Sequence, residues 1–203
     1  MNLVISESTL RLDPTVPSAA VDVLFFATGE CALGKVLVAR SAKGVCAILL
    51  GDNPEALESD LAARFPKSTL VANEAKVRDD LSKVIRHAAS PSEGLDLALD
   101  MRGTPLQRRV WDAIRAIQPG QTKSYMQIAR MINSAYPMVA ARVVGNACAA
   151  NPLALAIPCH RVIRSDGKLA GYRWGLERKR ELLAREQHSP ISCQASPAPP
   201  AAA

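Results

Sequence analysis

Residues 153–162 read LALAIPCHRV, an apolar run that leads into a cysteine, a histidine and an arginine. The first five residues form an apolar run that predicts a buried segment, and polar side chains interrupt it from Cys159 onward. Pro158 favours an irregular backbone at that point. His160 and Arg161 follow Cys159 directly, and a neighbouring imidazole or cation lowers the pKa of a thiol. The pattern therefore indicates a cysteine nucleophile.

The position of His160 sets a geometric condition on this interpretation. Adjacent residues of a regular strand point to opposite faces. His160 therefore reaches the thiol of Cys159 only from a non-strand backbone or through a bridging water. An acid to orient the histidine has to come from elsewhere in the chain. Glu186 is one of only five acidic residues after residue 100, and it lies in the last predicted helix, residues 176–186.

Two helix starts with capping signals precede the apolar run. The tetrapeptides 104–107 (TPLQ) and 124–127 (SYMQ) each place Thr or Ser three residues before Gln, which is the spacing of a capping box. The first predicts a helix that ends at 118–120 (QPG), and the second predicts a shorter helix through residue 132. A third helix is expected over 138–150. Helices joined by a turn on a basic background resemble a helix-turn-helix.

The N-terminal half has the pattern of a small α/β unit. Three short strands rich in Val, Leu, Ile and Phe are predicted at residues 21–26, 33–39 and 45–50. A helix starts at 52–55, where Pro and an acid suit a helix N-terminus. A second helix is predicted around 77–88, where apolar residues recur at helical spacing. The alternation of Leu with other residues at 95–99 predicts a further strand.

Charge is divided unevenly along the chain of 203 residues, whose net charge is +6. Residues 1–100 carry 10 Lys and Arg against 14 Asp and Glu, whereas residues 101–203 carry 15 against 5. Fourteen of those fifteen basic residues lie between Arg102 and Arg180, interleaved with apolar residues as on a folded surface. The asymmetry favours a polyanionic partner for the C-terminal half, with a solvated basic face as the alternative.

The composition is that of a globular protein, with 48% hydrophobic and 22% charged residues. It excludes wholesale disorder, collagen and a short disulfide scaffold, and no apolar run approaches the ~18 residues of a spanning helix. The N-terminus has no basic segment followed by an apolar core. The five cysteines show no paired spacing. We therefore expect a reduced, cytoplasmic protein that does not contact a membrane.

The motif PCHRV, residues 158–162, resembles the active-site motif of the O6-alkylguanine-DNA alkyltransferases. Three further motifs of that family occur in the family's order: SY at 124–125, ACAAN at 147–151 and GYRWG at 171–175. Residues 102–186 are most similar to the alkyltransferase half of the bacterial Ada-type members. Residues 21–100 resemble the family's less distinctive N-terminal subdomain.

The resemblance implies an α+β fold in two parts. Residues 21–101 would form a ribonuclease-H-like N-terminal subdomain of α/β type. Residues 102–187 would form a C-terminal winged helix-turn-helix domain that binds DNA and carries out alkyl transfer. Residues 1–20 would be an N-terminal extension, and residues 188–203, mostly Pro, Ala and Ser, predict a disordered tail.

The resemblance also implies a function, the repair of DNA by direct reversal of damage. The protein would bind duplex DNA through its helix-turn-helix in the minor groove and flip O6-methylguanine into a pocket, with O4-methylthymine as a further candidate substrate. Flipping is required because a thiolate has no in-line approach to a carbon inside the base stack. The alkyl group would move irreversibly to a cysteine, once per molecule. No metal or organic cofactor is implied, and a monomer is expected.

The catalytic roles carry over by position from the family. Cys159 matches the alkyl acceptor, and His160 matches the residue that deprotonates it through a water. Glu186 matches the acid that orients the histidine. Asn151 matches the residue that supports the turn between the DNA-binding helix and the site.

The DNA-binding and pocket roles carry over in the same way. Arg142 matches the finger that enters the base stack and fills the vacated space. Tyr125 matches the residue that crowds the target's phosphate, and Ser124 precedes it in the DNA-contacting motif. Tyr172 matches a donor to the guanine ring, which would improve guanine as a leaving group. Arg173 and Pro158 complete the implied substrate pocket.

The sequence departs from the family at residues 133–138, where the turn between the two DNA-contacting helices is longer, and at Gly145 and Asn146, where a side chain at 146 could crowd the minor groove. Ada's zinc ligands and activator helix-turn-helix are absent, so no transcriptional switch is implied unless the chain is a fragment of a longer protein. Three alternatives stay open. They are a lesion sensor without transfer activity, a winged-helix transcription factor and a cysteine hydrolase; single-turnover labelling of a cysteine would separate repair from all three.

Overall fold

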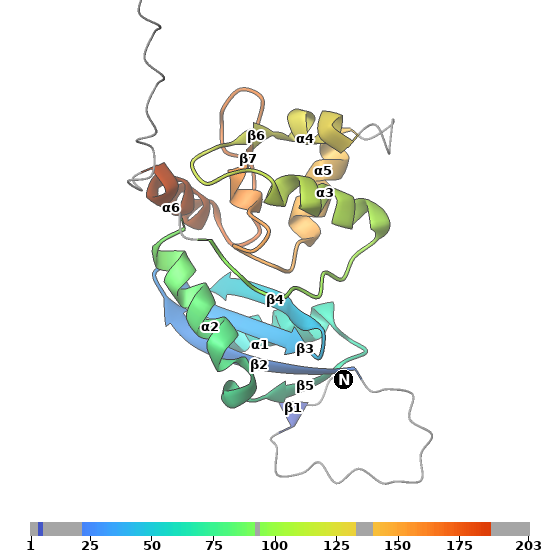
Figure 1. Ribbon diagram of the computed structural model, residues 1–203, viewed down its shortest axis with the longest axis vertical. Coiled ribbons are helices and arrows are strands. Elements are labelled where there is room, and N and C mark those ends of the chain that lie inside the picture. The colour runs from blue at the N-terminus through green and yellow to red at the C-terminus, as the bar shows by residue number, and fades with distance from the viewer. Residues whose placement is uncertain (1–3, 6–21, 92–93, 133–139, 188–203) are drawn as a thin grey trace, which may run out of the picture.

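The computed structural model describes residues 4–5, 22–91, 94–132 and 140–187. Figure 1 shows two lobes, one with the main sheet, α1 and α2, and the other with the helices α3 to α6. The first lobe contains β1 (Val4–Ile5), β2 (Val23–Cys31), β3 (Gly34–Ser41), β4 (Gly44–Gly51), α1 (Pro54–Arg64), β5 (Thr69–Ala72) and α2 (Glu74–Ala89). The second contains α3 (Pro105–Arg115), β6 (Lys123–Ser124), α4 (Tyr125–Ile132), α5 (Ala141–Ala150), the 3₁₀-helix η2 (Cys159–Arg161), β7 (Val162–Ile163) and α6 (Leu176–Gln187).

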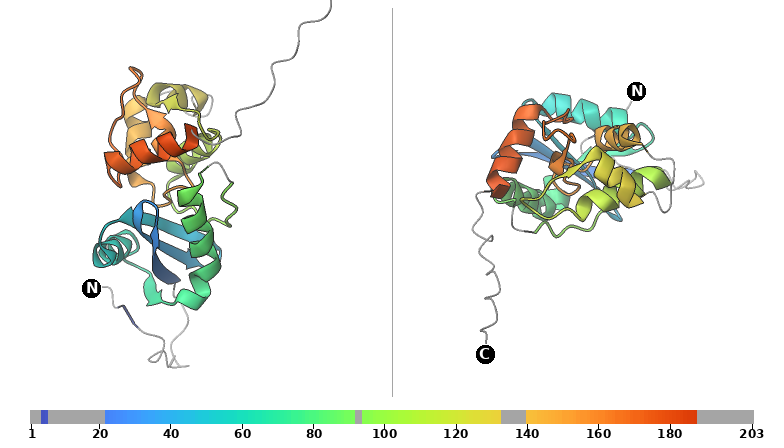
Figure 2. Two further views of the ribbon diagram at one scale, coloured as in Figure 1. Left: turned by 90° about the vertical axis from the view of Figure 1, so that its left-hand side faces the viewer. Right: turned by 90° about the horizontal axis from the view of Figure 1, so that it is seen from above.

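The sheet of the N-terminal lobe has the strand order β1-β5-β2-β3-β4. β2, β3 and β4 form an antiparallel meander, and β5 runs parallel to both β1 and β2. α1 and α2 cover opposite faces of this sheet (Figure 2). The three predicted N-terminal strands are confirmed, and the first continues beyond its predicted end to Cys31. Both predicted helices are also confirmed, and each starts at an Asn N-cap, Asn53 for α1 and Asn73 for α2.

The strand predicted at residues 95–99 does not form. Leu95, Leu97 and Leu99 are half-buried and alternate with exposed residues, so the two-residue period is present. However, the segment makes only an isolated bridge to the sheet, in which the amide of Val45 donates to the carbonyl of Ala98 at 2.8 Å. The two-residue period therefore comes from an extended segment that packs one side against the core but forms no ladder of hydrogen bonds with a neighbouring strand.

The outer edge of β4 joins the two lobes. Besides the contact with residues 98–100, Ile48 of β4 donates to Pro152 at 2.8 Å and accepts from the amide of Ala154 at 3.0 Å. These bonds satisfy part of an edge that would otherwise be exposed. They also fix the chain a few residues before the 3₁₀-helix that begins at Cys159.

The helix pattern predicted for the C-terminal lobe is confirmed at both capping boxes. Thr104 and Gln107 bond reciprocally at the start of α3, and Ser124 and Gln127 do so at the start of α4. α5 begins at Ala141, three residues after the predicted start. The longer turn expected at 133–138 lies outside the described residues, as do the tail at 188–203 and all of the N-terminal extension except β1.

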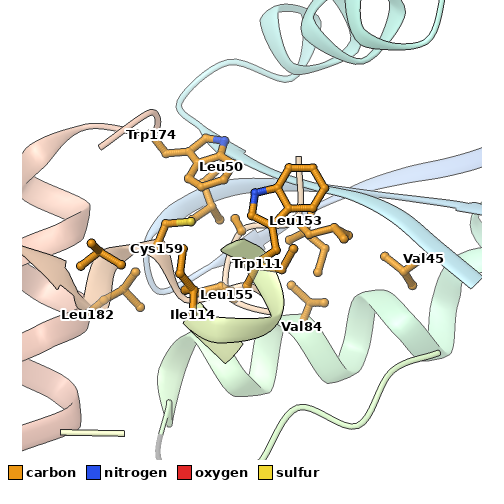
Figure 3. Close-up of a cluster of buried hydrophobic side chains, with 14 of the residues drawn as sticks. Val45, Leu50, Val84, Trp111, Ile114, Leu153, Leu155, Cys159, Trp174 and Leu182 are labelled. Atoms are coloured by element: carbon orange, nitrogen blue, oxygen red, sulfur yellow. The ribbon is translucent and has the colours of Figure 1, made fainter. Parts of the chain in front are cut away.

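One buried cluster connects the two lobes. It combines residues of the sheet and α2, such as Val45 and Val84, with residues of the C-terminal lobe, such as Trp111 and Leu153 (Figure 3). Cys159 belongs to the same cluster and is 3% exposed. A second cluster fills the opposite face of the sheet beneath α1. Within the described ranges, no helix combines the length and apolar character needed to cross a membrane.

Substitution of Gly44 tests the contact between β4 and the connection at residues 98–100. The φ of Gly44 is +144°, and a Cβ there would lie 2.3 Å from the carbonyl oxygen of Ala98. We expect Gly44→Ala to lower the free energy of unfolding by about 2–3 kcal/mol, because it adds both backbone strain and a clash with main-chain atoms. The measurement is urea denaturation followed by circular dichroism.

Gly94→Ala is the matched control, since a Cβ at Gly94 meets no atom within 4 Å among the described residues. It should change the free energy of unfolding by no more than about 0.5 kcal/mol. Equal stability of the two variants would contradict the close approach of residue 98 to Gly44.

Candidate functional site

The backbone at Cys159 departs from strand geometry, as the position of His160 required. Cys159 begins the one-turn helix η2, in which the amide of Arg161 donates to the carbonyl of Pro158 at 2.9 Å. Pro158 is the N-cap of this turn, with φ −77° and ψ 63°. Residues 159–161 therefore point in different directions around a tight turn, and all three are buried.

Glu186 on α6 is the acid to which this turn is bound. His160 Nε2 lies 2.7 Å from Oε1 of Glu186. Arg161 donates to the same carboxylate from Nε at 3.0 and 3.1 Å and from Nη2 at 2.9 Å. The amide of Gly120 donates to Oε2 at 3.1 Å. A buried charge needs this degree of compensation, and the carboxylate in turn fixes both residues that follow Cys159.

The protonation states in this network follow from its hydrogen bonds. Burial alone would raise the pKa of Glu186, but the bonds from His160 and Arg161 outweigh it and lower the pKa to about 2. An ionised carboxylate only accepts hydrogen bonds, so the proton of neutral His160 resides on Nε2. Burial lowers the pKa of His160, with Glu186 opposing that shift. Nδ1 of His160 is buried and has no hydrogen-bond partner among the described residues, so it is the available base.

Asn151 connects the end of α5 to the site. It is the C-cap of α5 and is fully buried. Its Nδ2 donates to Sγ of Cys159 at 3.2 Å and to the carbonyl of Ile157 at 3.0 Å, and its Oδ1 accepts from the amide of Leu153 at 2.8 Å. One side chain thus holds the turn and contacts the thiol.

The thiol of Cys159 is not the low-pKa group expected from its sequence neighbours. A hydrogen bond with Cys148, followed by burial, raises its pKa well above the usual range. Asn151 and the charge of Lys179 act in the opposite direction without offsetting that rise. The expectation failed because Arg161 is directed at Glu186, so its charge is neutralised there rather than placed beside the sulfur.

A pocket of about 620 Å³ gives access to the sulfur. Cys148 and Cys159 line it, together with Tyr172 from the loop that precedes α6. The hydroxyl of Tyr172 is buried and has no partner within the described part of the chain. Burial raises its pKa well above 10, so the group stays protonated and free to donate.

Arg173 and Pro158 were both assigned to the substrate pocket, but only Arg173 lines it. Arg173 lines it and also forms an ion pair with Asp60 on α1, with 2.6 Å between Nη2 and Oδ1. Pro158 is buried beneath the N-terminus of η2 and is not one of the side chains that line the pocket.

Two of the predicted DNA-contacting residues, Tyr125 and Arg142, line this pocket. Arg142 and Asn146 are exposed and one turn apart on α5, and Arg142 lines the pocket. Tyr125, the first residue of α4, lines it from the other side, and burial raises its pKa to about 12. Ser124 caps α4 and lines a neighbouring hollow with Arg164. Tyr125 and Arg142 thus line one pocket, whereas Ser124 lines the hollow beside it.

Sequence reasoning missed Lys179 and Cys148. Lys179 is fully buried on α6, and its Nζ donates to the carbonyls of Val162 at 2.6 Å and Ala170 at 3.2 Å. Its spacing of seven residues from Glu186 places the two on one face of the helix, a signal that could have been noticed. The contact of Cys148 with Cys159 had no comparable signal. Among the described residues, no group of three His, Cys, Asp or Glu side chains is arranged to hold a metal ion.

The chain is similar to several known proteins. Residues 105–188 match the family model described as 6-O-methylguanine DNA methyltransferase, DNA binding domain. The chain is 46% identical over 161 residues to the bifunctional transcriptional activator/DNA repair enzyme Ada of Escherichia coli, covering 79% of this chain and 45% of that protein. The chain therefore spans about half of Ada's length.

Two further relatives are covered almost completely. The methylated-DNA–protein-cysteine methyltransferase of Candida albicans is 33% identical over 173 residues, which cover 80% of this chain and 96% of that protein. The crystal structure of Mycobacterium tuberculosis OGT in complex with DNA matches with a TM-score of 0.63 and 32% identity, covering 80% of this chain and 92% of that one. Because these relatives are 32–33% identical and are covered over almost their full length, this chain belongs to the methylated-DNA–protein-cysteine methyltransferase family.

Proposed function

We propose that this protein repairs DNA by moving an alkyl group from O6 of guanine to Sγ of Cys159. The observation that carries the proposal is the thiol of Cys159 on the wall of a pocket, next to a His160–Glu186 pair whose free ring nitrogen is a base. The relatives' names support the same reaction. Because the thioether product does not hydrolyse, each molecule acts once.

The reaction balances without a cofactor. The proton of the Cys159 thiol moves, through a water, to Nδ1 of His160. The sulfur then attacks the alkyl carbon, the S–C bond forms and the C–O6 bond breaks with its electron pair on the oxygen. Glu186 stabilises the imidazolium through the Nε2 hydrogen bond. The guanine anion then takes a proton back from the imidazolium through the water, so the products are S-alkylcysteine, guanine and neutral His160.

Tyr172 is the group that we assign to the leaving guanine. Negative charge develops on the guanine ring as the C–O6 bond breaks, and a preorganised donor in a dry site stabilises it. The buried, unpartnered hydroxyl of Tyr172 on the pocket wall is such a donor. Its raised pKa keeps the proton available throughout the reaction.

We assign duplex DNA containing O6-alkylguanine to the face formed by α4 and α5. Arg142 is exposed at the mouth of the pocket, where it would enter the base stack when the target base is flipped out. Tyr125 would crowd the target's phosphate, and Arg164 adds a further positive charge to the rim. O4-methylthymine would be a second substrate of the same pocket.

The finer architecture is part of the proposal. We assign residues 21–101 to a ribonuclease-H-like subdomain and residues 102–187 to a winged helix-turn-helix domain. The two capping boxes at the starts of α3 and α4 and the short β6–β7 ladder support the second assignment. A monomer in the cytoplasm suits a protein that acts once on a single base.

Mass spectrometry after mixing the protein with a duplex that carries one O6-methylguanine tests the transfer. We expect one added methyl group, located on the peptide of Cys159 and saturating at one per molecule. Cys159→Ala should take up none and should still bind the duplex, because the rim residues are unchanged. Methylation of that variant at wild-type level would refute the acceptor assignment, and lesion binding without any transfer by the wild type would indicate a sensor.

Arg142→Ala should separate base flipping from chemistry. We expect transfer from the duplex to slow by about tenfold or more, because the variant has no side chain to fill the space that the flipped base leaves in the stack. Reaction with free O6-benzylguanine needs no flipping and should change less than about twofold. Arg115→Ala, which removes an exposed arginine from α3, is the control. An equal slowing on both substrates would show that Arg142 has no role in flipping.

Glu186→Gln should destabilise the protein in a pH-dependent way. It leaves the guanidinium of Arg161 buried without its carboxylate, which costs about 3–5 kcal/mol at pH 7. The folded-state pKa of Glu186 is about 2 against an ordinary 4.5. Its stabilising contribution is therefore present above pH 4.5 and is lost as the pH falls toward 2. Urea denaturation should show a smaller difference from wild type at pH 3 than at pH 7.

Glu177→Gln is the control for that measurement, because Glu177 lies on the same helix with a side chain that is 87% exposed. It should have little effect at either pH. A difference between wild type and Glu186→Gln that does not depend on pH would contradict the ionised state of this carboxylate.

A further inference from the structure

The pocket wall that carries Tyr172 and Arg173 belongs to the connection between β7 and α6, which contains no helix or strand. Such a segment depends on side-chain contacts for its position. Trp174 anchors it in the buried cluster, and the carbonyl of Trp174 accepts from Nη1 of Arg178 at 3.0 Å. Arg178 in turn donates from Nε to the carbonyl of Leu33 at 2.7 Å. The loop is thus fixed on one side by the turn between β2 and β3.

Asp60 of α1 holds the same loop from another direction. Its Oδ1 lies 2.6 Å from Nη2 of Arg173, and its Oδ2 lies 3.1 Å from Nε of Arg64. Both oxygens of one carboxylate are therefore engaged. Asp60 is not among the residues that line the pocket, whereas Arg173 is.

The other partner of Asp60 reaches the end of α5. Nη1 of Arg64 lies within hydrogen-bond reach of the carbonyl of Ala150, at 3.5 Å. Ala150 directly precedes Asn151, whose side chain contacts Sγ of Cys159. One carboxylate of the N-terminal lobe thus connects two segments that meet in the pocket.

We propose that Asp60 is a positioning residue for alkyl transfer, which acts by holding Arg173 and the pocket wall of residues 170–173 in place. The inference rests on the proposed transfer to Cys159 and adds to it a residue outside the C-terminal lobe. A wall held in place keeps Tyr172 where the leaving guanine needs a donor. Displacements of about 1 Å at such a group are enough to reduce a rate.

A purely electrostatic role for Asp60 predicts effects of the opposite sign. Arg142, Arg164 and Arg173 line the pocket, so removing a nearby negative charge would strengthen the attraction of DNA phosphates and speed transfer from a duplex. It would leave the reaction with an uncharged free base unchanged. Loss of positioning instead slows the reaction with both substrates, because both use the same wall.

The test is the rate of benzyl transfer from free O6-benzylguanine to the full-length chain, followed over a range of concentrations by mass spectrometry. Asp60→Asn should lower the limiting rate constant about threefold, a size in keeping with a partly exposed ion pair. Asp60→Glu should restore part of the loss. Glu58→Gln removes a carboxylate from the same helix that forms no ion pair among the described residues, and it should match wild type.

Arg173→Gln and the double variant complete the experiment. If Asp60 acts through Arg173, the double variant should be no slower than Arg173→Gln alone. Additive losses, or a wild-type rate for Asp60→Asn with the free base, would overturn the inference while leaving the transfer intact. A wild-type chain that takes up no benzyl group on Cys159 would overturn the proposed function and this inference together. Thermal unfolding of each variant identifies any loss that comes from instability, and Arg173→Gln, which leaves the Asp60–Arg64 pair in place, then carries the test.

Discussion

The carboxylate of Glu186 is the point on which the site depends. It is 4% exposed, and it accepts hydrogen bonds from His160, from Arg161 and from the amide of Gly120. These donors come from the turn at Cys159 and from the segment after α3, so one buried charge ties both to α6. An uncompensated charge at this depth would cost several kcal/mol. The arrangement that stabilises the carboxylate is therefore the one that leaves Nδ1 of His160 free to act as a base.

Cys159, the proposed acceptor, rests as a thiol for two reasons. The charge of Arg161 is neutralised by Glu186 and does not act on the sulfur. A hydrogen bond with Cys148 and burial then raise the pKa of the Cys159 thiol, which keeps it protonated. A thiol is a weaker nucleophile than a thiolate, so the proposed transfer needs a base that removes this proton. In the proposed reaction Nδ1 of His160, which has no hydrogen-bond partner among the described residues, is that base.

Much of the architecture follows from local signals that tertiary contacts do not override. The capping boxes at Thr104 and Ser124 place two helices within a residue of their observed starts. The assignments of Cys159 and Glu186 followed from the family resemblance, and they remain predictions. The structure places Glu186 against His160 and Arg161, the two residues that follow Cys159. The strand expected at 95–99 does not form. An alternating pattern indicates which side of an extended segment is buried, but it does not show that a neighbouring strand is available for pairing. The raised pKa of Cys159 was equally out of reach, since it depends on Cys148, eleven residues earlier, being folded against the sulfur.

The role of the N-terminal lobe is the part that no motif reveals. This lobe supplies none of the residues that line the pocket, yet three of its features touch the segments that build it. The edge of β4 bonds to residues 152–154, the carbonyl of Leu33 accepts from Arg178, and Asp60 pairs with Arg173. Each of these contacts holds either an irregular segment of the chain or a residue close to one. Irregular backbone has no internal ladder to fix it, so its geometry has to be imposed from outside. The N-terminal lobe therefore fixes, from outside, the irregular segments next to the pocket.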